Sequence, residues 1–326
     1  MSDQQRPLQD GARTSSGEEI DLTFSPGGAG RYAPSPTGEL HVGNLRTALL
    51  AWAFARATGR KFFMRMEDLD RGRYRSANQQ LEDLRLMGID WDGPVVTVSE
   101  RLHLYEDALE RLKESGLVFE CYCSRKDIRE AVSAAHGSPD QYPGTCLHLN
   151  EEQRNVRRAE LNRVGRRPAL RLKPDVETWT VQDVLHGSYT GRVDNVVLQR
   201  GDGAFAYNLA VAVDDHLMGV DQVVRGDDLL SSAPVHSYLR DALGGGEPSY
   251  VHVPLVLGRE GERLSKRDGA VTIKELEEVG VGIPELFRMI ASSLELPEVS
   301  DAQHFLDAFS AARRIMPQSP WVFRGI

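Results

Sequence analysis

The first group of residues that could do chemistry lies where an extended segment runs into a predicted helix. It reads Pro34-Ser-Pro-Thr-Gly-Glu-Leu-His-Val-Gly-Asn44. A helix N-terminus carries unpaired N–H groups and a partial positive charge, and both attract phosphates. Gly43 would let a nucleotide approach the backbone closely, and His41 and Asn44 would add side-chain donors. The spacing favours a phosphate site, although a capped helix with a surface histidine also fits these residues.

The second group is a basic segment, Arg263-Leu-Ser-Lys-Arg267, which follows the apolar run Val251–Leu257 and a turn that contains glycine. A mobile loop with several cations can close over a polyphosphate and neutralise the charge that develops on it. A basic loop by itself usually faces solvent. Each group stands beside a predicted strand, and together they predict a nucleotide site more specifically than either does alone.

The third group consists of the three cysteines, Cys121, Cys123 and Cys146, which lie within one short span. An odd number of cysteines in an intracellular chain fits metal ligation or free thiols better than a disulfide framework. Thiolates are good zinc ligands, and a structural zinc site needs four ligands. The cysteines would supply three of them, and on zinc chemistry alone His148 is the commoner type of fourth ligand. Three unligated thiols are the alternative.

The elements that must position the first group form a strand–helix–strand unit. Two prolines keep residues 31–38 extended. Apolar residues recur at helical spacing over 44–57, and Gly59 is a plausible helix end. Residues 61–66 (KFFMRM) are typical of a strand that is buried on both faces, as in a parallel sheet. This order predicts a βαβ unit and an α/β fold.

A second set of elements lies farther along the chain. The pattern predicts an amphipathic helix over 99–115 that ends at Gly116, and buried strands over 220–224 and 251–257. A helix over 228–243 would connect these two strands. The sheet therefore resumes after an insertion, and the remaining tail is mostly helical in pattern.

The composition of the 326-residue chain is that of a globular protein, with 40% hydrophobic and 27% charged residues. The net charge of −9 argues against a protein that coats nucleic acid non-specifically, although a local basic surface could still dock on a structured RNA. Residues 59–75 and 151–175 are locally basic, and solvated charged faces explain them equally well. We expect a cytoplasmic protein without a membrane segment, and a mobile leader over 1–28.

The first two groups resemble the HIGH and KMSKS signatures of class I aminoacyl-tRNA synthetases. The surrounding blocks are similar to the glutamyl branch, and the resemblance covers roughly residues 29–300: RYAPSPTGELHVGNLRTALLAW, FMRMEDLDRGR, YNLAVAVDDHLMGVDQVVRGDDLL and RLSKRDGAV. Such enzymes join an amino acid carboxylate to the α-phosphate of ATP and expel pyrophosphate, with Mg²⁺ expected beside ATP. The resemblance implies that His41, Gly43 and Asn44 hold ATP and that Lys266 stabilises the transition state. Arg263 stands where the family's nominal residue is lysine, and the charge is retained.

A glutamate substrate needs cations for its carboxylates and an acid for its ammonium group. Arg31 and Arg225 are candidates for the carboxylates, since guanidinium binds a carboxylate in a two-pronged fork, and Glu67 suits the ammonium. An acidic metal site or a polar turn is the alternative for Glu67 and its acidic neighbours. The resemblance implies this glutamate pocket: Arg31, Tyr32, Ala33, Pro34, Ser35, Glu67, Tyr207 and Arg225.

The resemblance also bears on the cysteines. The branch that ends in Tyr-x-x-x-Cys uses the tyrosine oxygen as a ligand, so we expect one structural Zn²⁺ per chain. The expected ligands are Cys121, Cys123, Tyr142 and Cys146, with His148 as the rival to the tyrosine.

Only residues 267–326 follow Lys266, fewer than the roughly 100 that an anticodon-binding domain would need. The chain therefore resembles a truncated branch of the glutamyl enzymes. By resemblance, that branch activates L-glutamate with ATP without tRNA and transfers it to queuosine in the anticodon loop of tRNA(Asp). The alternatives are a minimal glutamyl-tRNA synthetase that charges the 3′ end of tRNA(Glu) and a catalytically silent RNA-binding paralogue.

The expected architecture is a Rossmann-type parallel sheet split by a zinc-bearing insertion, in a monomer without an anticodon-binding domain. Its expected parts are a leader (1–28), the first half of the catalytic domain (29–120), the insertion (121–195), the second half (196–262), and a basic loop with a helical stem-contact segment (263–326).

Overall fold

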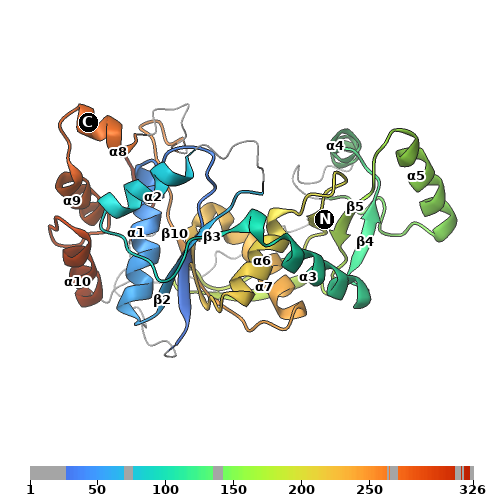
Figure 1. Ribbon diagram of the computed structural model, residues 1–326, viewed down its shortest axis with the longest axis horizontal. Coiled ribbons are helices and arrows are strands. Elements are labelled where there is room, and N and C mark those ends of the chain that lie inside the picture. The colour runs from blue at the N-terminus through green and yellow to red at the C-terminus, as the bar shows by residue number, and fades with distance from the viewer. Residues whose placement is uncertain are drawn as a thin grey trace, which may run out of the picture.

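The computed structural model describes residues 27–69, 76–134, 142–262, 264, 271–312, 317 and 319–323. The molecule is elongated, with α9 and α10 at one end and α4 and α5 at the other (Figure 1). Between the ends lies a mostly parallel sheet with helices on both faces, as an α/β fold requires. None of the helices that the structure describes is both long and apolar enough to cross a membrane.

The first half of the sheet is built from three parallel strands in the order β1 (Ala29–Tyr32), β2 (Lys61–Met66) and β3 (Val96–Thr97). Helix α1 (Val42–Ala57) connects β1 to β2, which confirms the predicted βαβ unit. The helix begins two residues before the predicted start. It is buried on nearly all sides because it lies between the sheet and the C-terminal helices, and it therefore lacks a polar stripe.

The second half of the sheet contains β9 (Gln222–Gly226) and β10 (Ser249–Val253), which are parallel. A 3₁₀ helix, η3 (Asp227–Ser232), and α7 (Ala233–Ala242) connect them. The N–H of Asp221 donates to the carbonyl of Ala29 at 3.0 Å, so β9 begins beside β1. The order is thus β3-β2-β1-β9-β10, and it reverses between β1 and β9, where ligands bind in open α/β sheets.

The insertion contains an antiparallel sheet in the order β4 (Val118–Cys121), β5 (Ala169–Leu172) and β8 (Val197–Gln199). Helices α4 (Arg125–Ala134) and α5 (Glu151–Arg163) accompany it at one end of the molecule (Figure 1).

A hairpin within the predicted insertion range 121–195 belongs to the main sheet. It consists of β6 (Thr178–Asp183) and β7 (Gly187–Arg192), and β6 pairs with β10 through Asp183 and Tyr250. The side chain of Trp179 explains this placement, since its indole N–H donates to Ser237 on α7 at 3.2 Å. The chain therefore joins the main sheet at β6 and β7, inside the predicted insertion range, and returns to the sheet of the insertion at β8.

The remaining elements cover the sheet and its edges. They are α2 (Ala77–Leu86), η2 (Val98–Glu100), α3 (Leu102–Glu114), α6 (Tyr207–Leu217), β11 (Val256–Leu257), α8 (Ile273–Glu278), α9 (Ile283–Ser293), α10 (Ala302–Ala312) and β12 (Trp321–Val322). The predicted helical tail is confirmed in α8 to α10, and Phe54 of α1 packs edge-on against Phe309 of α10, with ring centroids 4.9 Å apart. Strand β12 pairs with β11, since the Trp321 N–H donates to the Leu255 carbonyl at 3.0 Å.

Candidate active site

A cavity of about 640 Å³ beside the sheet reversal lies over the start of α1. The loop after β1 forms one wall, and residues after β9 and β10 form the other. The sequence-predicted residues that line it are Tyr32, Ala33, Pro34, Ser35, His41, Gly43 and Asn44. The cavity is large enough for a nucleotide and lies where the fold class binds one.

The N-terminus of α1 is capped by its own histidine. His41 Nδ1 accepts from the N–H groups of Gly43 at 3.1 Å and Asn44 at 3.4 Å, and the Asn44 side chain accepts from the His41 N–H at 3.3 Å. The Val42 N–H donates to the Val271 carbonyl at 3.0 Å. The N–H groups expected to be unpaired are therefore occupied here. A phosphate would meet the helix dipole and the His41 and Asn44 side chains instead.

Gly43 is required by the histidine rather than by backbone strain. A Cβ added at this position would lie 3.0 Å from Cε1 and 3.1 Å from Nδ1 of His41. A side chain at this position would therefore force the His41 ring to shift by a few tenths of an ångström.

The loop between β1 and α1 is held from outside by α2. The Gln80 amide, 2% exposed, donates to the carbonyls of Ser35 and Gly38. The Glu67 N–H donates to the Pro34 carbonyl at 3.0 Å. The loop is thus fixed between two strand ends, and it separates the nucleotide cavity from a second one.

The second cavity, of about 400 Å³, shares Ser35 and Thr37 with the first. It is also lined by Glu67 and Tyr207, two of the residues predicted for glutamate. Burial raises the pKa of Tyr207, and the charge of Glu67 adds to this, so the two groups interact. The cavities meet at Ser35 and Thr37, where an amino acid carboxylate could reach a nucleotide phosphate.

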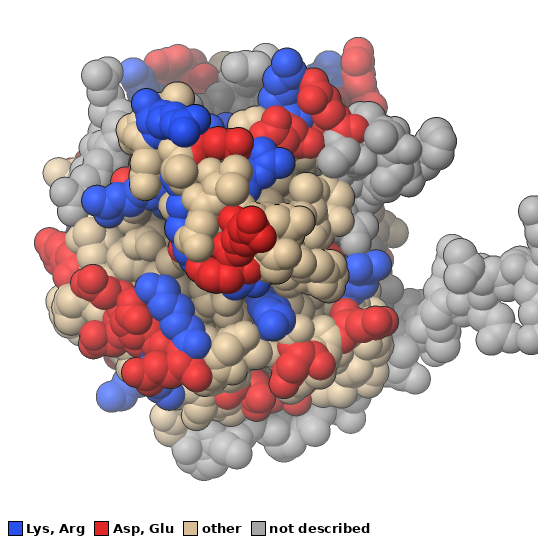
Figure 2. Space-filling view, turned by 90° about the vertical axis from the view of Figure 1, so that its right-hand side faces the viewer, with Lys and Arg blue, Asp and Glu red and all other residues tan. Residues whose placement is uncertain are grey.

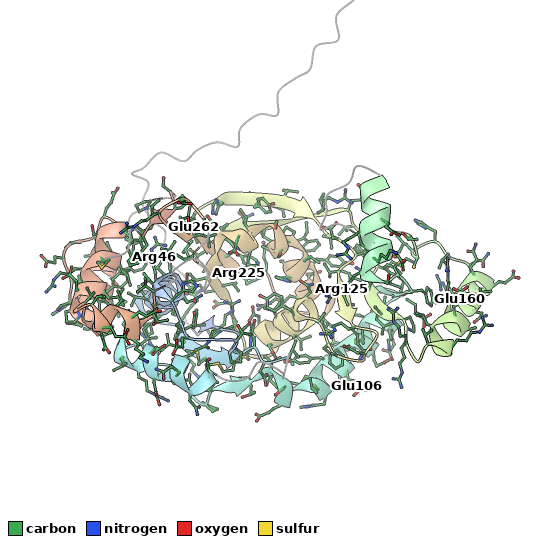
Figure 3. All side chains as sticks on the ribbon, turned by 90° about the horizontal axis from the view of Figure 1, so that it is seen from above. Arg46, Glu106, Arg125, Glu160, Arg225 and Glu262 are labelled. Atoms are coloured by element: carbon green, nitrogen blue, oxygen red, sulfur yellow. The ribbon has the colours of Figure 1, made fainter. Side chains whose placement is uncertain are left out.

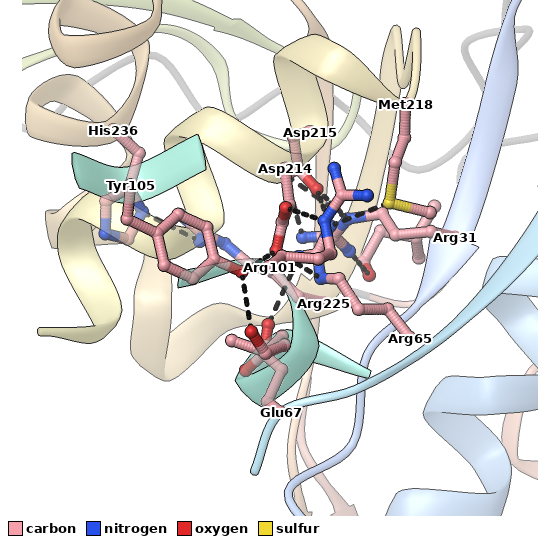
Figure 4. A network of polar contacts seen from close by, with 12 residues as sticks. Arg31, Arg65, Glu67, Arg101, Tyr105, Asp214, Asp215, Met218, Arg225 and His236 are labelled. Carbon is pink, nitrogen blue, oxygen red and sulfur yellow. Dashed lines mark hydrogen bonds and ion pairs between the residues drawn. The ribbon is translucent and has the colours of Figure 1, made fainter. Parts of the chain in front are cut away.

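Arg31 is not one of the residues that line the two cavities, and it is 4% exposed. Its Nε donates to Asp215 Oδ1 at 3.1 Å, and its Nη2 donates to Oδ2 at 3.3 Å. Arg65, fully buried, donates to the same Asp215 at 2.6 Å and to Glu67 at 3.2 Å (Figure 4). Two buried charged residues, Asp215 and Arg65, therefore connect Arg31 to Glu67. Arg31 and Glu67 are both residues that the sequence predicts to bind the glutamate substrate.

The charges in this cluster shift two carboxyl groups in opposite directions. Burial alone would raise the pKa of Asp215, but the charges of Arg31 and Arg65 outweigh it and hold the pKa well below its usual range. Burial raises the pKa of Glu67, and the same two arginines only partly offset this. Asp215 is thus a permanent anion, whereas Glu67 has an elevated pKa, as acids in working sites often do.

The neighbouring Asp214 closes the network on its far side. It is 0% exposed, accepts from Arg101 at 2.6 Å and accepts from the Tyr105 hydroxyl at 2.7 Å. Sequence reasoning missed Asp214, Asp215 and Arg65 as site residues. One signal was present: two adjacent acids in the otherwise apolar stretch YNLAVAVDDHL must meet buried cations.

Arg225, at the end of β9, lies in the middle of the molecule (Figure 3) and is 6% exposed. Its Nη2 donates to the carbonyl of Leu229, which lines the nucleotide cavity. It also bonds His236, which in turn bonds Asn208 of the second cavity. Arg225 is therefore connected to lining residues of both cavities, and like Arg31 it is not itself one of the residues that line them.

The predicted catalytic Lys266, together with Arg263, lies outside the described residues. The described neighbours of this segment are close to the nucleotide cavity. Leu264 lines it, and Val271 accepts from the first N–H of α1. The two ends of the segment that carries Lys266 therefore converge on the start of α1.

The three cysteines converge in the insertion, with sulfur atoms that all lie within 4.8 Å of one another. Cys123 and Cys146 are 3.5 Å apart, and none of the three forms a disulfide. Hydrogen bonds from the Cys123 and Cys146 thiols lower the pKa of Cys121. Three thiols that lie this close together fit a tetrahedral ion that accepts sulfur ligands, such as zinc.

Tyr142 is the fourth member of this cluster. Its hydroxyl lies 3.4 Å from the sulfur of Cys121 and 3.8 Å from that of Cys123. The side chain is buried, and Arg171 lies over its ring at 4.0 Å. The rival His148 is exposed and does not belong to the cysteine cluster. The three thiolates and the Tyr142 oxygen could therefore hold a zinc ion together.

The basic character of residues 151–175 is largely neutralised on α5. Arg154 and Arg158 both pair with Glu151, and Arg157 pairs with Glu160. On the described part of this end of the molecule, cations and acids are interspersed (Figure 2). A solvated charged face explains this helix better than a continuous basic surface does.

The fold and the site together define the catalytic domain of a class I aminoacyl-tRNA synthetase. Residues 29–309 match the family described as tRNA synthetases class I (E and Q), catalytic domain, and the chain belongs to that family. Two glutamate-tRNA synthetase crystal structures are similar at 25% identity. The one from Elizabethkingia anophelis has a TM-score of 0.74 and covers 91% of this chain and 68% of its own. The one from Elizabethkingia meningosepticum has a TM-score of 0.72 and covers 90% and 66%.

Relatives with higher sequence identity show to which branch of the family the chain belongs. The chain is 53% identical to a glutamyl-Q tRNA(Asp) synthetase from Nocardia farcinica, over 91% of this chain and 93% of the relative. It is 47% identical to one from Cutibacterium acnes, over 86% and 79%. The chain therefore belongs to the glutamyl-Q tRNA(Asp) synthetase family and is a ligase of the aminoacyl-tRNA synthetase type.

Proposed function

We propose that this enzyme activates L-glutamate with ATP in the absence of tRNA and transfers the glutamyl group to queuosine in the anticodon loop of tRNA(Asp). The observation that carries the proposal is the 53% identity to a glutamyl-Q tRNA(Asp) synthetase across nearly the full length of that relative.

The two adjoining cavities support the activation step. ATP would lie over α1, with its phosphates at His41 and Asn44, and glutamate would lie beside Glu67 and Tyr207. A carboxylate oxygen of glutamate would attack the α-phosphorus near Ser35, and the bond to the β-phosphate oxygen would break, so that pyrophosphate leaves with the electron pair. Positioning and charge stabilisation supply most of the rate in such a transfer.

Activation without tRNA is supported by the way the buried arginines are held. Arg31 is fixed by Asp215, and Arg225 by two histidines and a carbonyl, all of which belong to this chain. A glutamate pocket whose buried arginines are already in place needs no RNA to order them. Glu67 is held in the same way by Arg65.

In the transfer step, a hydroxyl of the queuosine cyclopentene diol would attack the glutamyl carbonyl carbon. A new ester bond forms, the bond from that carbon to the phosphate oxygen breaks, and the hydroxyl proton goes to the departing AMP phosphate. The second cavity offers an entry, since Phe205 lines it and packs edge-on against Tyr105 with centroids 5.7 Å apart. A fixed aromatic ring suits an unstacked base.

The zinc belongs to the same proposal. One Zn²⁺ per chain would be held by Cys121, Cys123, Tyr142 and Cys146, all four positions being taken by protein. The ion would stabilise the insertion structurally and take no part in the reaction.

Two assays test the proposal. Pyrophosphate exchange into ATP should depend on glutamate and proceed without tRNA. Labelled glutamate should then be transferred to tRNA(Asp) that contains queuosine and not to the same tRNA without it, and nuclease digestion should place the label on the queuosine nucleoside. Label on a terminal adenosine, or on tRNA(Glu), would favour the charging of a 3′ end, which the 36% identity to a Bacillus licheniformis glutamate–tRNA ligase also suggests.

A further inference from the structure

Arg225 is surrounded by hydrogen-bond acceptors that carry no charge. Its Nε donates to His252 Nε2 at 2.9 Å, its Nη1 to His236 Nδ1 at 3.1 Å, and its Nη2 to the Leu229 carbonyl at 3.1 Å. The guanidinium also lies over the Tyr250 ring at 5.5 Å. The contacts come from η3, α7 and β10, so Arg225 is fixed from several sides.

The proton positions in both histidines follow from these contacts. A guanidinium can only donate, so the ring nitrogens that it touches must be unprotonated acceptors. The other nitrogens then carry the protons: His252 Nδ1 donates to Asp183 at 2.6 Å, and His236 Nε2 donates to Asn208 Oδ1 at 2.9 Å. Each ring therefore has both nitrogens satisfied in a single neutral tautomer.

Burial keeps both rings neutral. His252 is 0% exposed and His236 is 4% exposed. Burial lowers the pKa of His236 well below its usual value, and the Arg225 charge adds to this. Burial also lowers the pKa of His252, outweighing the bond to Asp183. A second proton on either ring would put two donors face to face.

Arg31 has the opposite environment. Its partner Asp215, which it shares with Arg65, is a buried anion that offsets its charge directly, at 3.1 Å. The direct partners of Arg225 leave its charge in place. Three of the five N–H groups of its guanidinium donate to these partners. The others, one on each terminal nitrogen, have no partner among the described residues. Paired N–H groups of this kind match a carboxylate.

We propose that His236 and His252 are positioning residues, and that by fixing Arg225 through neutral acceptors they make it the cation that selects an amino acid with a carboxylate side chain over its amide. This inference rests on the glutamate activation proposed above. Arg31 then contributes hydrogen bonds near the substrate but little net charge.

An isosteric pair of variants at one position tests this. His236→Gln keeps a neutral acceptor for Arg225, whereas His236→Glu supplies an anion that pairs with it. Glutamate- and glutamine-dependent pyrophosphate exchange is measured for both. We expect kcat/KM for glutamate to stay within about threefold in His236→Gln and to fall about 10- to 100-fold in His236→Glu, the usual size for a bond to a charged group. In His236→Glu the preference for glutamate over glutamine should fall by the same factor. The change should lie in KM for the amino acid and not in KM for ATP.

A second pair at the other ring keeps the test independent of how well one variant folds. His252→Gln can still accept from Arg225, and His252→Leu cannot. KM for glutamate should rise at least about tenfold more in the leucine variant. An unchanged preference in His236→Glu, or equal losses for glutamate and ATP in all four variants, overturns the positioning role. Absence of glutamate-dependent exchange in the unaltered enzyme would instead overturn the proposed function.

Discussion

Replacing Asp215 by asparagine removes the anion on which Arg31 and Arg65 converge. The carboxylate is 9% exposed, and the two guanidinium groups are 4% and 0% exposed, so solvent cannot compensate for the change. Breaking a buried ion pair by removing one partner costs about 3–5 kcal/mol. The asparagine oxygen can still accept one bond, so we expect a loss near the lower end, about 3 kcal/mol, in the free energy of unfolding. KM for glutamate should rise as well, because Arg31 and, through Arg65, Glu67 lose their support.

Urea unfolding at neutral pH measures this loss. The matched control is Asp202→Asn, which removes an acid from an ion pair with Arg200 that is about half exposed on both sides, and it should cost less than about 1 kcal/mol. A result for Asp215→Asn that cannot be distinguished from this control would refute the view that Asp215 holds the cluster together.

The pH dependence provides a second check on Asp215. Its pKa is depressed in the folded state, so its contribution to stability is present above the unfolded value of about 3.9 and is lost as the pH falls through the folded value. The stability difference between the unaltered protein and Asp215→Asn should therefore be constant from pH 5 to 8 and shrink below about pH 4. A difference that grows in acid would contradict the assignment.

Three further predictions concern other parts of the site. Tyr142→Phe should lower the zinc retained per chain after dialysis, measured by metal analysis, while His148→Ala, at an exposed position, should not; the reverse pattern would make the histidine the ligand. His41→Ala should cost about 1 kcal/mol of stability through loss of the helix cap, whereas His41→Asn should recover the stability but not pyrophosphate exchange; recovery of both would reduce His41 to a cap. Because the pKa of Glu67 is raised, KM for glutamate should begin to rise on acidification at a higher pH than the ordinary glutamic acid value of about 4.3, and a KM that stays flat to that value would mean that Glu67 does not bind the ammonium group.

Local pattern was enough to predict the elements that carry the nucleotide site. The apolar strand KFFMRM and a helix that ends before Gly59 are confirmed, although the helix begins at Val42 and not at Asn44, because their signals lie within a few residues of one another. The convergence of the cysteines could also be expected, since all three lie in one short span. In each case the physical cause is local in sequence.

The buried ion pairs and the edge of the sheet depend instead on contacts between residues that are distant in sequence. Arg31 and Asp215 are 184 positions apart, and no periodicity connects them. The pairing of β6 with β10 likewise arises from tertiary packing around Trp179 and was hidden inside a stretch that reads as an insertion. The capping of α1 by His41 depends on one side-chain rotamer, which a sequence motif does not specify.

The pairing of β12 with β11 has a practical consequence for handling the protein. Leu255 and Val256 line the nucleotide cavity, and the backbone of Trp321 and Phe323 completes the hydrogen bonding of that stretch from the other side. Trimming the chain before residue 321, by a protease or by a shortened gene, would leave an open β edge next to the cavity that we propose for ATP. An affinity tag or fluorophore attached directly at β12 should weaken ATP binding, although β12 is remote in sequence from the helix-start motif at residues 41–44.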